Sequence, residues 1–591
     1  MTAIITDRAS IAKQIALALN IELKTGSEGY FQGRGYTVVW MPDELVSLAQ
    51  PEDCGKKRLA KNDLPFIPKP FVLSLRKQKT GKKPAALTDK TALKQLEIIR
   101  KIFNDCQSII AATEPNEQGE LNFRRMYAYL QCTKPFRRLA LHSLTLKAIG
   151  EGFKNLRESA LYDNLYAAAD CREKADYLIK INASNAFSLS TGMANRSLGR
   201  IEMPVLAMVC KRFAEHRKFI SKRFYEHGIT LEKDGQLRRF KVPGKIEKKK
   251  KAEKIYQQLK NFREVHIIKT AVQSAVQPAP MLYNLTELQK EASVRYGFSA
   301  SKTMETARKL YEEKLISYPL TDSRRIPESV FSGIYKIIRQ TAAYCELADR
   351  LEVIDQSNLN RRSVGDVHIS EPHALIPTGV YPPCLSKDGK LIYRLIAGRT
   401  LEAFAPDCVK EITSVEAACG NRKLESQLSE ILCLGWRAIL NREEDREENE
   451  LKADDILPAF TEGETVRISG WNLLTKKTLP KALYTEASLS AEMENSCLGT
   501  PQTRAEIIET LLSCNYMERR KQSLIPTEKG QVVYNCIKDM RIADMELAAS
   551  WEKMSAEIRE GKQDADTFMR AFEIFVKQAT EEILNMQKIS P

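Results

Sequence analysis

Residues 315–323 read LISYPLTDS, and this short stretch is the starting point for interpreting the chain. A strongly helical pattern over residues 286–315 leads into it, after a proline-rich link at 277–280. Tyrosine is common in strands, so Tyr318 is a candidate for an aromatic residue that simply packs within one. A tyrosine phenol can also act as a nucleophile, which makes Tyr318 a candidate for covalent catalysis. The stretch by itself leaves both interpretations open.

The N-terminal part of the chain has an α/β pattern. Residues 3–5 are an apolar strand candidate followed by Asp7, and Ser10 is expected to cap the next helix. A second strand candidate at 108–113 ends in the acidic loop 114–120. Ligands bind at the carboxyl ends of strands in open α/β sheets, so these acids indicate a site. The alternative is that they cap helices and complement helix dipoles.

The rest of the chain alternates between helical and β-type patterns. Residues 158–213 are helical, short β-type stretches occupy 224–276, and β-like pieces return over 401–483. The last hundred residues are helical again, with helix-start signals at Thr500 and Ser550. This alternation predicts a chain of several domains.

Composition narrows the class of protein. The 591 residues include 43% hydrophobic residues, which excludes disorder along the whole length. Lys and Arg number 91 against 76 Asp and Glu, and the net charge of +15 favours polyanions such as nucleic acid. The 13 cysteines form no CxxC pair, which argues against a Cys-rich zinc site and predicts the reducing cytoplasm. No apolar run of about 18 residues occurs, so no membrane span is expected.

Further motifs lie in order on both sides of LISYPLTDS. They are TDRASIAKQIA at 6–16, EPNEQGE at 114–120, SLGRIEMP at 197–204, LYNLTELQKEA at 282–292, GFSA at 297–300, HALIPT at 373–378, GTPQTRA at 499–505 and PTEKG at 526–530. Together they resemble the type IA DNA topoisomerases, particularly the topoisomerase III branch, whose patterns include IxYPRTDS, AEKPSxAKxIA and DPDREGE. Matches in the same order along most of the chain are hard to obtain by chance.

The resemblance implies a multidomain fold of α/β, α and β parts. An N-terminal TOPRIM domain over 1–150 would precede a ring-forming type IA topoisomerase core. The expected core comprises a helical DNA-binding segment at 151–215, a β-rich arch segment at 216–280, the active-site tyrosine domain at 281–400, a returning β-rich arch segment at 401–485 and a C-terminal helical segment at 486–591.

The resemblance also implies catalytic roles. Tyr318 occupies the position of the family's nucleophile, Asp7 stands where the family has a glutamate, and Lys13 matches a family lysine. The family's active-site histidine falls on Pro372 in a gapless match, while His373 lies one position later. Either His373 takes the role after a one-residue shift, or the role is vacant.

The family's acidic Mg²⁺-binding trio is only partly present. Its DxDxE positions hold Glu114, Asn116 and Gln118, so one carboxylate of three remains, and Glu120 matches the last acid of the longer motif. Mg²⁺ is usually bound by one or two carboxylates with waters and phosphate oxygens. Glu114 and Glu120 are therefore predicted to hold Mg²⁺ weakly.

Four arginines are candidate DNA contacts by the same resemblance. Arg8 replaces a family lysine, and Arg200 and Arg504 lie in retained motifs. Leu320 replaces the arginine two residues after the nucleophile, which removes a bidentate phosphate clamp. Arg324 lies close enough in sequence to compensate. The alternatives are a structural ion pair for Arg200, a surface arginine pair for Arg324 and a helix-capping context for Arg504.

The leading hypothesis is a type IA DNA topoisomerase that works without ATP. It would cut one strand through a 5′-phosphotyrosine, pass another strand and rejoin the first. The expected partners are single-stranded and underwound duplex DNA, with a helicase as a further candidate, and the expected state is a cytoplasmic monomer. Two alternatives stay open: a catalytically degenerate clamp on single-stranded DNA, motivated by Asn116, Gln118, Leu320 and Pro372, and a TOPRIM nuclease, against which the tyrosine motif argues.

Overall fold

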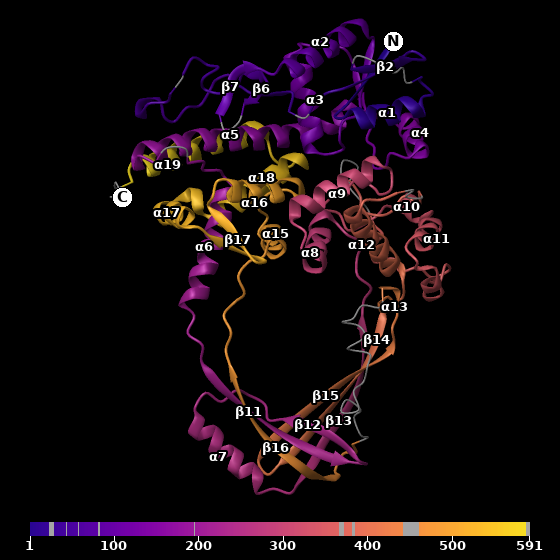
Figure 1. Ribbon diagram of the computed structural model, residues 1–591, viewed down its shortest axis with the longest axis vertical. Coiled ribbons are helices and arrows are strands. Elements are labelled where there is room, and N and C mark those ends of the chain that lie inside the picture. Colours follow the sequence, from indigo (N-terminus) through magenta and orange to yellow (C-terminus); the bar gives the residue numbers. More distant parts are fainter. Residues whose placement is uncertain are drawn as a thin grey trace.

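The structure is a computed structural model that describes residues 1–22, 29–42, 44–56, 58–80, 83–193, 196–365, 372–380, 384–440 and 460–586. Its elements form a ring around an open centre (Figure 1). An N-terminal sheet with its helices lies at one end of the long axis, and a β-barrel lies at the opposite end. The tyrosine segment and the C-terminal helices lie beside each other next to the N-terminal part, so the residues around Tyr318 sit where the ring closes.

A six-stranded sheet organises the N-terminal part, in the order β10-β9-β8-β1-β3-β2. Strand β1 lies between β3 and β8 and runs parallel to both. Its residues Ala3, Ile4 and Ile5 are fully buried, which explains why an apolar run rather than an alternating pattern forms this strand. The elements are β1 Thr2–Thr6, α1 Ala9–Ala18, β2 Tyr30–Gly33, β3 Tyr36–Trp40, β4 Val46–Leu48, β5 Leu73–Leu75, β6 Lys77–Thr80, β7 Lys83–Thr88, α2 Lys90–Asp105, β8 Ser108–Ala111, α3 Glu117–Tyr129, β9 Phe136–Arg138, α4 Leu146–Lys154 and β10 Arg157–Glu158.

The two acidic strand ends meet at the carboxyl edge of this sheet. Asp7 directly follows β1, and Glu114 lies shortly after β8. Because β1 and β8 are adjacent and parallel, their carboxyl ends bring Asp7 and Glu114 together. Both predicted strands are confirmed by β1 and β8, while α3 begins at Glu117, inside the stretch 114–120 that was interpreted as a loop.

The prediction that Ser10 caps the first helix is wrong. Helix α1 begins at Ala9, and its N-cap position is Arg8, whose side chain makes no capping hydrogen bond. Ser10 therefore lies inside the first turn, and its hydroxyl donates to Glu312 Oε2 at 3.1 Å instead. A serine shortly after a strand is a common helix cap, which is why the sequence predicts one here. The sequence does not show that Glu312 binds the serine hydroxyl.

The C-terminal helices pack against the long helix α5 in one apolar core. Helix α19 runs alongside α5 (Figure 1), and Trp551 contacts the ring of Phe572 with centroids 4.9 Å apart. Thr500 caps α16 as predicted, whereas Ser550 lies within α18, which Asp544 caps. The elements are α5 Asp163–Thr191, α6 Glu202–Lys218, α15 Glu486–Asn495, α16 Pro501–Ser513, β17 Met517–Arg520, β18 Ser523–Pro526, α17 Glu528–Ile537, α18 Met545–Arg559 and α19 Ala565–Leu584. Within the described ranges, no helix combines the length and apolar composition needed to cross a membrane.

The tyrosine segment shares its core with the N-terminal part. Tyr311 and Tyr318 belong to the same buried cluster as Ile4, Ile11 and Ile110. The stretch 315–323 forms no regular strand; it makes a single antiparallel bridge at Ile316 and runs on as loop. The helices here are α8 Leu285–Tyr296, α9 Ala300–Glu312, α10 Glu328–Phe331, α11 Ile334–Tyr344, α12 Lys387–Phe404 and α13 Arg437–Leu440.

Six strands from two separate parts of the chain close the barrel, in the order β11-β12-β15-β14-β13-β16. Helix α7 covers it, with Ile255 and Leu259 buried in the barrel core. The strands and helix are β11 Arg223–Lys233, β12 Gln236–Lys241, α7 Lys249–Lys260, β13 Glu264–Gln277, β14 Cys408–Cys419, β15 Arg422–Cys433 and β16 Thr465–Lys477. The stretches 216–280 and 401–485, expected to be β-rich, each supply three of these strands.

Candidate active site

Tyr318 lies buried between the tyrosine segment and the N-terminal sheet. Its side chain is 1% exposed, and its backbone N–H donates to the carbonyl of His142 at 2.9 Å. The hydroxyl donates to Glu114 Oε2 at 2.7 Å and accepts a hydrogen bond from Asn116 Nδ2 at 2.6 Å. The ring of Tyr311 stands edge-on at a centroid distance of 5.3 Å. The phenol oxygen therefore has both a proton acceptor and a proton donor in contact.

Asn116 is oriented by the helix that it caps. Its Oδ1 accepts the N–H of Gly119, as expected of an N-cap residue of α3. Since the oxygen is committed to the cap, Nδ2 points the other way, towards Tyr318 at 2.6 Å and Gln502 Oε1 at 3.2 Å. Gln502 comes from the first turn of α16, so the amide links three parts of the chain at one point.

Two carboxylates lie beside the phenol. Asp7 is buried, and its Oδ2 accepts the backbone N–H of Glu114. The Glu114 side chain is 12% exposed, and Oε2 is the oxygen that binds Tyr318. The same Oε2 lies 3.9 Å from a terminal nitrogen of Arg308 on α9. The site therefore holds two acids, with the Arg308 guanidinium near the Glu114 carboxylate and Arg138 donating to the Glu114 backbone carbonyl at 2.6 Å.

Burial raises the pKa of the Tyr318 phenol well above its ordinary value of 10, because the charged phenolate would lose its hydration. The charge of Glu114, and the hydrogen bond that its carboxylate accepts, raise this pKa further. The guanidinium of Arg308 acts in the opposite direction. The phenol is thus neutral near pH 7 and needs a base to give up its proton, a role for which Glu114 is already in contact.

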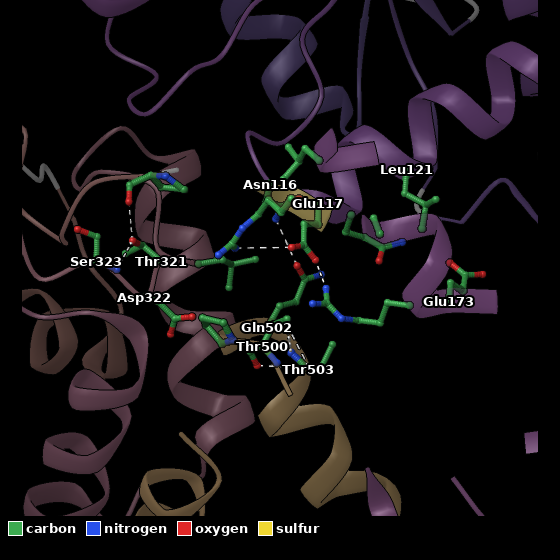
Figure 2. A pocket seen from close by; sticks show the side chains of 18 of the residues that line it. Asn116, Glu117, Leu121, Glu173, Thr321, Asp322, Ser323, Thr500, Gln502 and Thr503 are labelled. Carbon is green, nitrogen blue, oxygen red and sulfur yellow. Dashed lines mark hydrogen bonds and ion pairs between the residues drawn. The ribbon is translucent and has the colours of Figure 1, made fainter. Parts of the chain in front are cut away.

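A cleft of about 510 Å³ opens next to this site (Figure 2). It is lined by the start of α3, by α5, by residues 320–323 and by the first turn of α16. Arg172 contributes a guanidinium from α5, but Glu117 binds it as an ion pair. The cleft walls carry more carboxylates than guanidinium groups.

Comparison with known proteins places the chain in a family. A family model described as DNA topoisomerase matches residues 160–570. DNA topoisomerase 3 from Bacillus subtilis (strain 168) is 32% identical over 99% of this chain and 82% of that protein. DNA topoisomerase 3 from Bacillus licheniformis is 31% identical over 98% of this chain and 81% of that protein. The chain belongs to the type IA DNA topoisomerases.

The likeness extends to the fold. Full-length topoisomerase I from Thermotoga maritima superposes with a TM-score of 0.75 at 21% identity, covering 98% of this chain and 90% of that chain. The predicted mixture of α and β parts in a type IA topoisomerase architecture is thereby confirmed. The topoisomerase is an isomerase that binds DNA, as predicted. Its TOPRIM assignment and domain boundaries stay predictions.

The two carboxylates predicted to bind Mg²⁺ differ in what they contact. Glu120 is fully buried; its Oε1 accepts from Arg124 Nε at 2.7 Å, and Arg138 Nε lies 3.2 Å from its Oε2. Both oxygens are therefore committed to guanidinium groups, while Glu114 faces Tyr318. Among the described residues, no group of three or more His, Cys, Asp or Glu side chains is arranged to hold a metal ion. This donor set does not fit a Mg²⁺ ion shared by Glu114 and Glu120.

The predicted lysine and two of the predicted arginines differ in exposure and in the groups that they contact. Lys13 is exposed on α1, and no hydrogen bond or ion pair joins it to another described residue. Arg8 pairs with Glu312 at 2.8 Å, across the boundary between the N-terminal part and α9. Arg324 donates to the backbone carbonyls of Met281 and Leu282 at 3.5 and 3.2 Å. The fold thus brings neither Lys13 nor Arg324 into contact with Tyr318.

Arg200 and Arg504 are buried and bonded within the protein. Arg200 is held by Asp176 at 2.7 Å and by Glu552 at 2.6 Å. Arg504 donates to Thr286 Oγ1 at 3.1 Å and lies 3.3 Å from Asp322 Oδ1. The contacts of Arg200 are those of a structural ion pair. Arg504 connects α16 to the tyrosine segment. Their roles in DNA binding stay predictions.

His373 lies beside a second histidine. Its Nδ1 is 2.8 Å from the carbonyl of Ala374, and its ring centroid is 5.9 Å from that of His142. Burial lowers the pKa of His373, and burial together with His373 lowers the pKa of His142 to about 3. Both imidazoles are therefore neutral near pH 7. The backbone carbonyl of His142 accepts the backbone N–H of Tyr318, and this hydrogen bond joins the histidine pair to the tyrosine residue.

Sequence reasoning missed three residues that contact or face the phenol's partners. Asn116 was treated as a lost metal ligand, although an amide at a helix N-cap can donate to a neighbouring oxygen. Gln502 lies inside the quoted motif GTPQTRA and was not singled out. Arg308 carries no motif at all; the available signal was a basic residue on the helix that leads into LISYPLTDS.

Proposed function

We propose that this topoisomerase cuts one DNA strand through Tyr318, passes a second strand through the gap and rejoins the first. The observation that carries the proposal is the contact of the Tyr318 hydroxyl with Glu114 and Asn116 where the ring closes. A 5′-phosphotyrosyl bond retains the energy of the broken phosphodiester, so rejoining needs no ATP. The buried, raised pKa of the phenol supports a mechanism with a dedicated base.

The proposed cleavage step balances its protons between the two acids. The phenol oxygen attacks phosphorus and its proton passes to Glu114, while the bond from phosphorus to the 3′ oxygen breaks. The departing 3′ oxygen receives a proton from Asp7, which enters this step in its protonated form and lies against the Glu114 backbone. Religation runs the same transfers in reverse. Asn116 Nδ2 donates to the phenol oxygen and stabilises the negative charge that develops there.

We also propose a substrate, an oligomeric state, a partner and domain assignments, all of which are more specific than the family assignment. The substrate would be single-stranded or underwound duplex DNA, bound by a monomer, with a helicase as a candidate partner. The sheet over residues 1–150 would correspond to the TOPRIM domain, and residues 281–400 to the tyrosine domain. Mg²⁺ stays a prediction that a titration of cleavage and relaxation can test, and no step above is assigned to it.

The first prediction concerns the nucleophile. The Tyr318→Phe protein is expected to form no covalent adduct with DNA and to relax no negatively supercoiled plasmid, because it lacks the attacking oxygen. Denaturing gels of the protein mixed with labelled single-stranded oligonucleotide measure the adduct, and agarose gels measure relaxation. Tyr335→Phe, on α11 of the same segment, is the matched control and is expected to behave as the wild type.

The same gels separate the proposal from its rivals. A clamp that binds DNA without cutting it would retain oligonucleotide and give no adduct in any variant. A nuclease would give shortened oligonucleotide without attached protein. Relaxation by Tyr318→Phe at the wild-type rate would remove Tyr318 from the mechanism.

A further inference from the structure

The proposed reaction leaves the charge of the scissile phosphate without a partner. The carboxylate of Glu114 contacts the phenol, and Asp7 lies against the Glu114 backbone. The position two residues after the nucleophile is Leu320, which is buried and cannot bind a phosphate. A phosphodiester that approaches the phenol brings a negative charge, and the transition state carries more. Some positive group must offset it, or the Glu114 carboxylate would repel the substrate.

Arg308 is the guanidinium that lies beside the phenol's proton acceptor. It lies on α9, and a terminal nitrogen is 3.9 Å from Glu114 Oε2, the oxygen that accepts the Tyr318 hydroxyl. At 3.9 Å this is an ion pair without a hydrogen bond. The side chain is 21% exposed, so it is partly buried yet reachable. Its positive charge also opposes the rise in the pKa of Tyr318 that burial and Glu114 cause.

The donors of Arg308 are largely unused. Its Nε is buried and has no hydrogen-bond partner among the described residues. A guanidinium group has five N–H donors in a planar fork, and that fork matches two phosphate oxygens at once. Arg200 and Arg504 differ in this respect, since both are bonded to carboxylates or hydroxyls inside the protein. A partly exposed guanidinium with unused donors, whose terminal nitrogen lies 3.9 Å from the carboxylate that binds the phenol, therefore points to an anionic ligand.

We propose that Arg308 binds the nonbridging oxygens of the scissile phosphate and offsets the charge that develops on them during cleavage and religation. The inference rests on the proposed function, because it needs Tyr318 as the nucleophile. Arg308 takes the place of the clamp that Leu320 cannot provide. It also supplies positive charge in a site where Glu120 is bound by arginines and where Asn116 and Gln118 are neutral.

One consequence concerns the metal. A protein-borne cation at the phosphate reduces the need for an ion at Glu114. Cleavage by the wild type is therefore expected to persist when divalent ions are chelated.

The test compares Arg308→Gln and Arg308→Lys with Lys309→Gln. Lys309 is the next residue on α9, and it is exposed and pairs with Glu305 at 3.4 Å. The adduct rate is measured on a single-stranded oligonucleotide, with Mg²⁺ and with a chelator. Arg308→Gln is expected to slow cleavage by about 10²–10³-fold, the usual cost of removing one charge-stabilising donor. Arg308→Lys should recover part of the rate, and Lys309→Gln should match the wild type.

Binding is measured separately, by fluorescence anisotropy of the same oligonucleotide in a Tyr318→Phe background. Arg308→Gln is expected to weaken binding far less than it slows cleavage, because the charge matters most in the transition state. Wild-type cleavage by Arg308→Gln, or wild-type cleavage that stops when Mg²⁺ is chelated, would overturn the inference while leaving Tyr318 as the nucleophile. Absence of an adduct from the wild type itself would overturn both proposals. If circular dichroism shows that Arg308→Gln is unfolded, the cleavage rate of Arg308→Lys decides instead.

Discussion

At the scale of single residues, the site is defined by what each polar atom near Tyr318 can accept or donate. The phenol is surrounded by an acceptor, Glu114 Oε2, and a donor, Asn116 Nδ2, so it can lose a proton and still have its negative charge stabilised. Its raised pKa means that little phenolate forms unaided at neutral pH. In the proposed mechanism, chemistry at Tyr318 therefore depends on Glu114 as base.

Glu114→Gln tests that dependence through pH. Without the carboxylate the cleavage rate at pH 7 is expected to fall by about 10²–10⁴-fold, the usual contribution of a general base. Removing the negative charge lowers the pKa of Tyr318 relative to the wild type, but burial still holds it above the ordinary value. The variant's rate should then rise by about tenfold per pH unit from pH 7 to 9, as the phenolate fraction grows.

Rapid-quench measurement of the adduct across that range supplies the profile. The wild type is expected to show little pH dependence there, because its base is already in place. An equally flat profile for Glu114→Gln would mean that another group accepts the proton.

The sequence predicted part of this site at residue level and could not predict the rest. Tyr318 and Asp7 were named from motif positions, and the structure brings both to Glu114. Glu120 was grouped with Glu114 because both are acids of one short motif. The sequence does not show that Arg138 comes from a neighbouring strand and binds Glu120. Arg308 was missed for the same reason, since only the packing of α9 places it beside Glu114.

At the scale of secondary structure, caps position the reactive groups. The first turn of α3 fixes Asn116, and the first turn of α16, capped by Thr500, presents Gln502 to the same amide. Thr500 could be predicted because a proline follows it directly in the helix. Ser10 could not, because its hydroxyl has a tertiary partner in Glu312. Caps are thus readable from sequence where the partner is local, and unreadable where it is distant.

Variants at Asn116 separate the cap from the donor. Asn116→Ala removes both and is expected to cost about 1 kcal/mol of stability, measured as a lower melting temperature, as well as slowing cleavage. Asn116→Asp keeps a capping oxygen, so the melting temperature should stay near the wild-type value. Its carboxylate cannot donate to the phenol and adds a charge beside Glu114, so cleavage in chelator should slow further than in Asn116→Ala.

Added Mg²⁺ gives the Asn116→Asp variant a second readout. The amide nitrogen lies 3.2 Å from Glu114 Oε2, so a carboxylate there would create an acidic pair able to share a cation. Magnesium is expected to restore part of the cleavage rate of Asn116→Asp and none of that of Asn116→Ala. Identical magnesium responses of the two variants would contradict this account.

At the scale of the whole molecule, the reactive site coincides with the closure of the ring (Figure 1). The N-terminal part and the tyrosine segment are held together by the Tyr318 contacts, by the Tyr311 hydroxyl on the Leu141 carbonyl at 3.0 Å and by Glu312 with Arg8 and Ser10. The sequence suggested separate domains but could not predict which contacts close them, because every pair joins residues more than a hundred positions apart. We expect these contacts to open when a strand enters the centre of the ring.

Locking this boundary should therefore stop strand passage without stopping cleavage. Cysteines introduced as Ser10→Cys and Glu312→Cys, whose native side chains are 3.1 Å apart, can be joined by a short reducible bis-methanethiosulfonate spacer. The locked protein is expected to form the covalent adduct at the wild-type rate and to relax supercoiled plasmid about tenfold more slowly or worse, since opening gates turnover. Reduction should restore relaxation. The wild type treated with the same reagent controls for its native cysteines, and relaxation at full rate by the locked protein would show that the ring opens elsewhere.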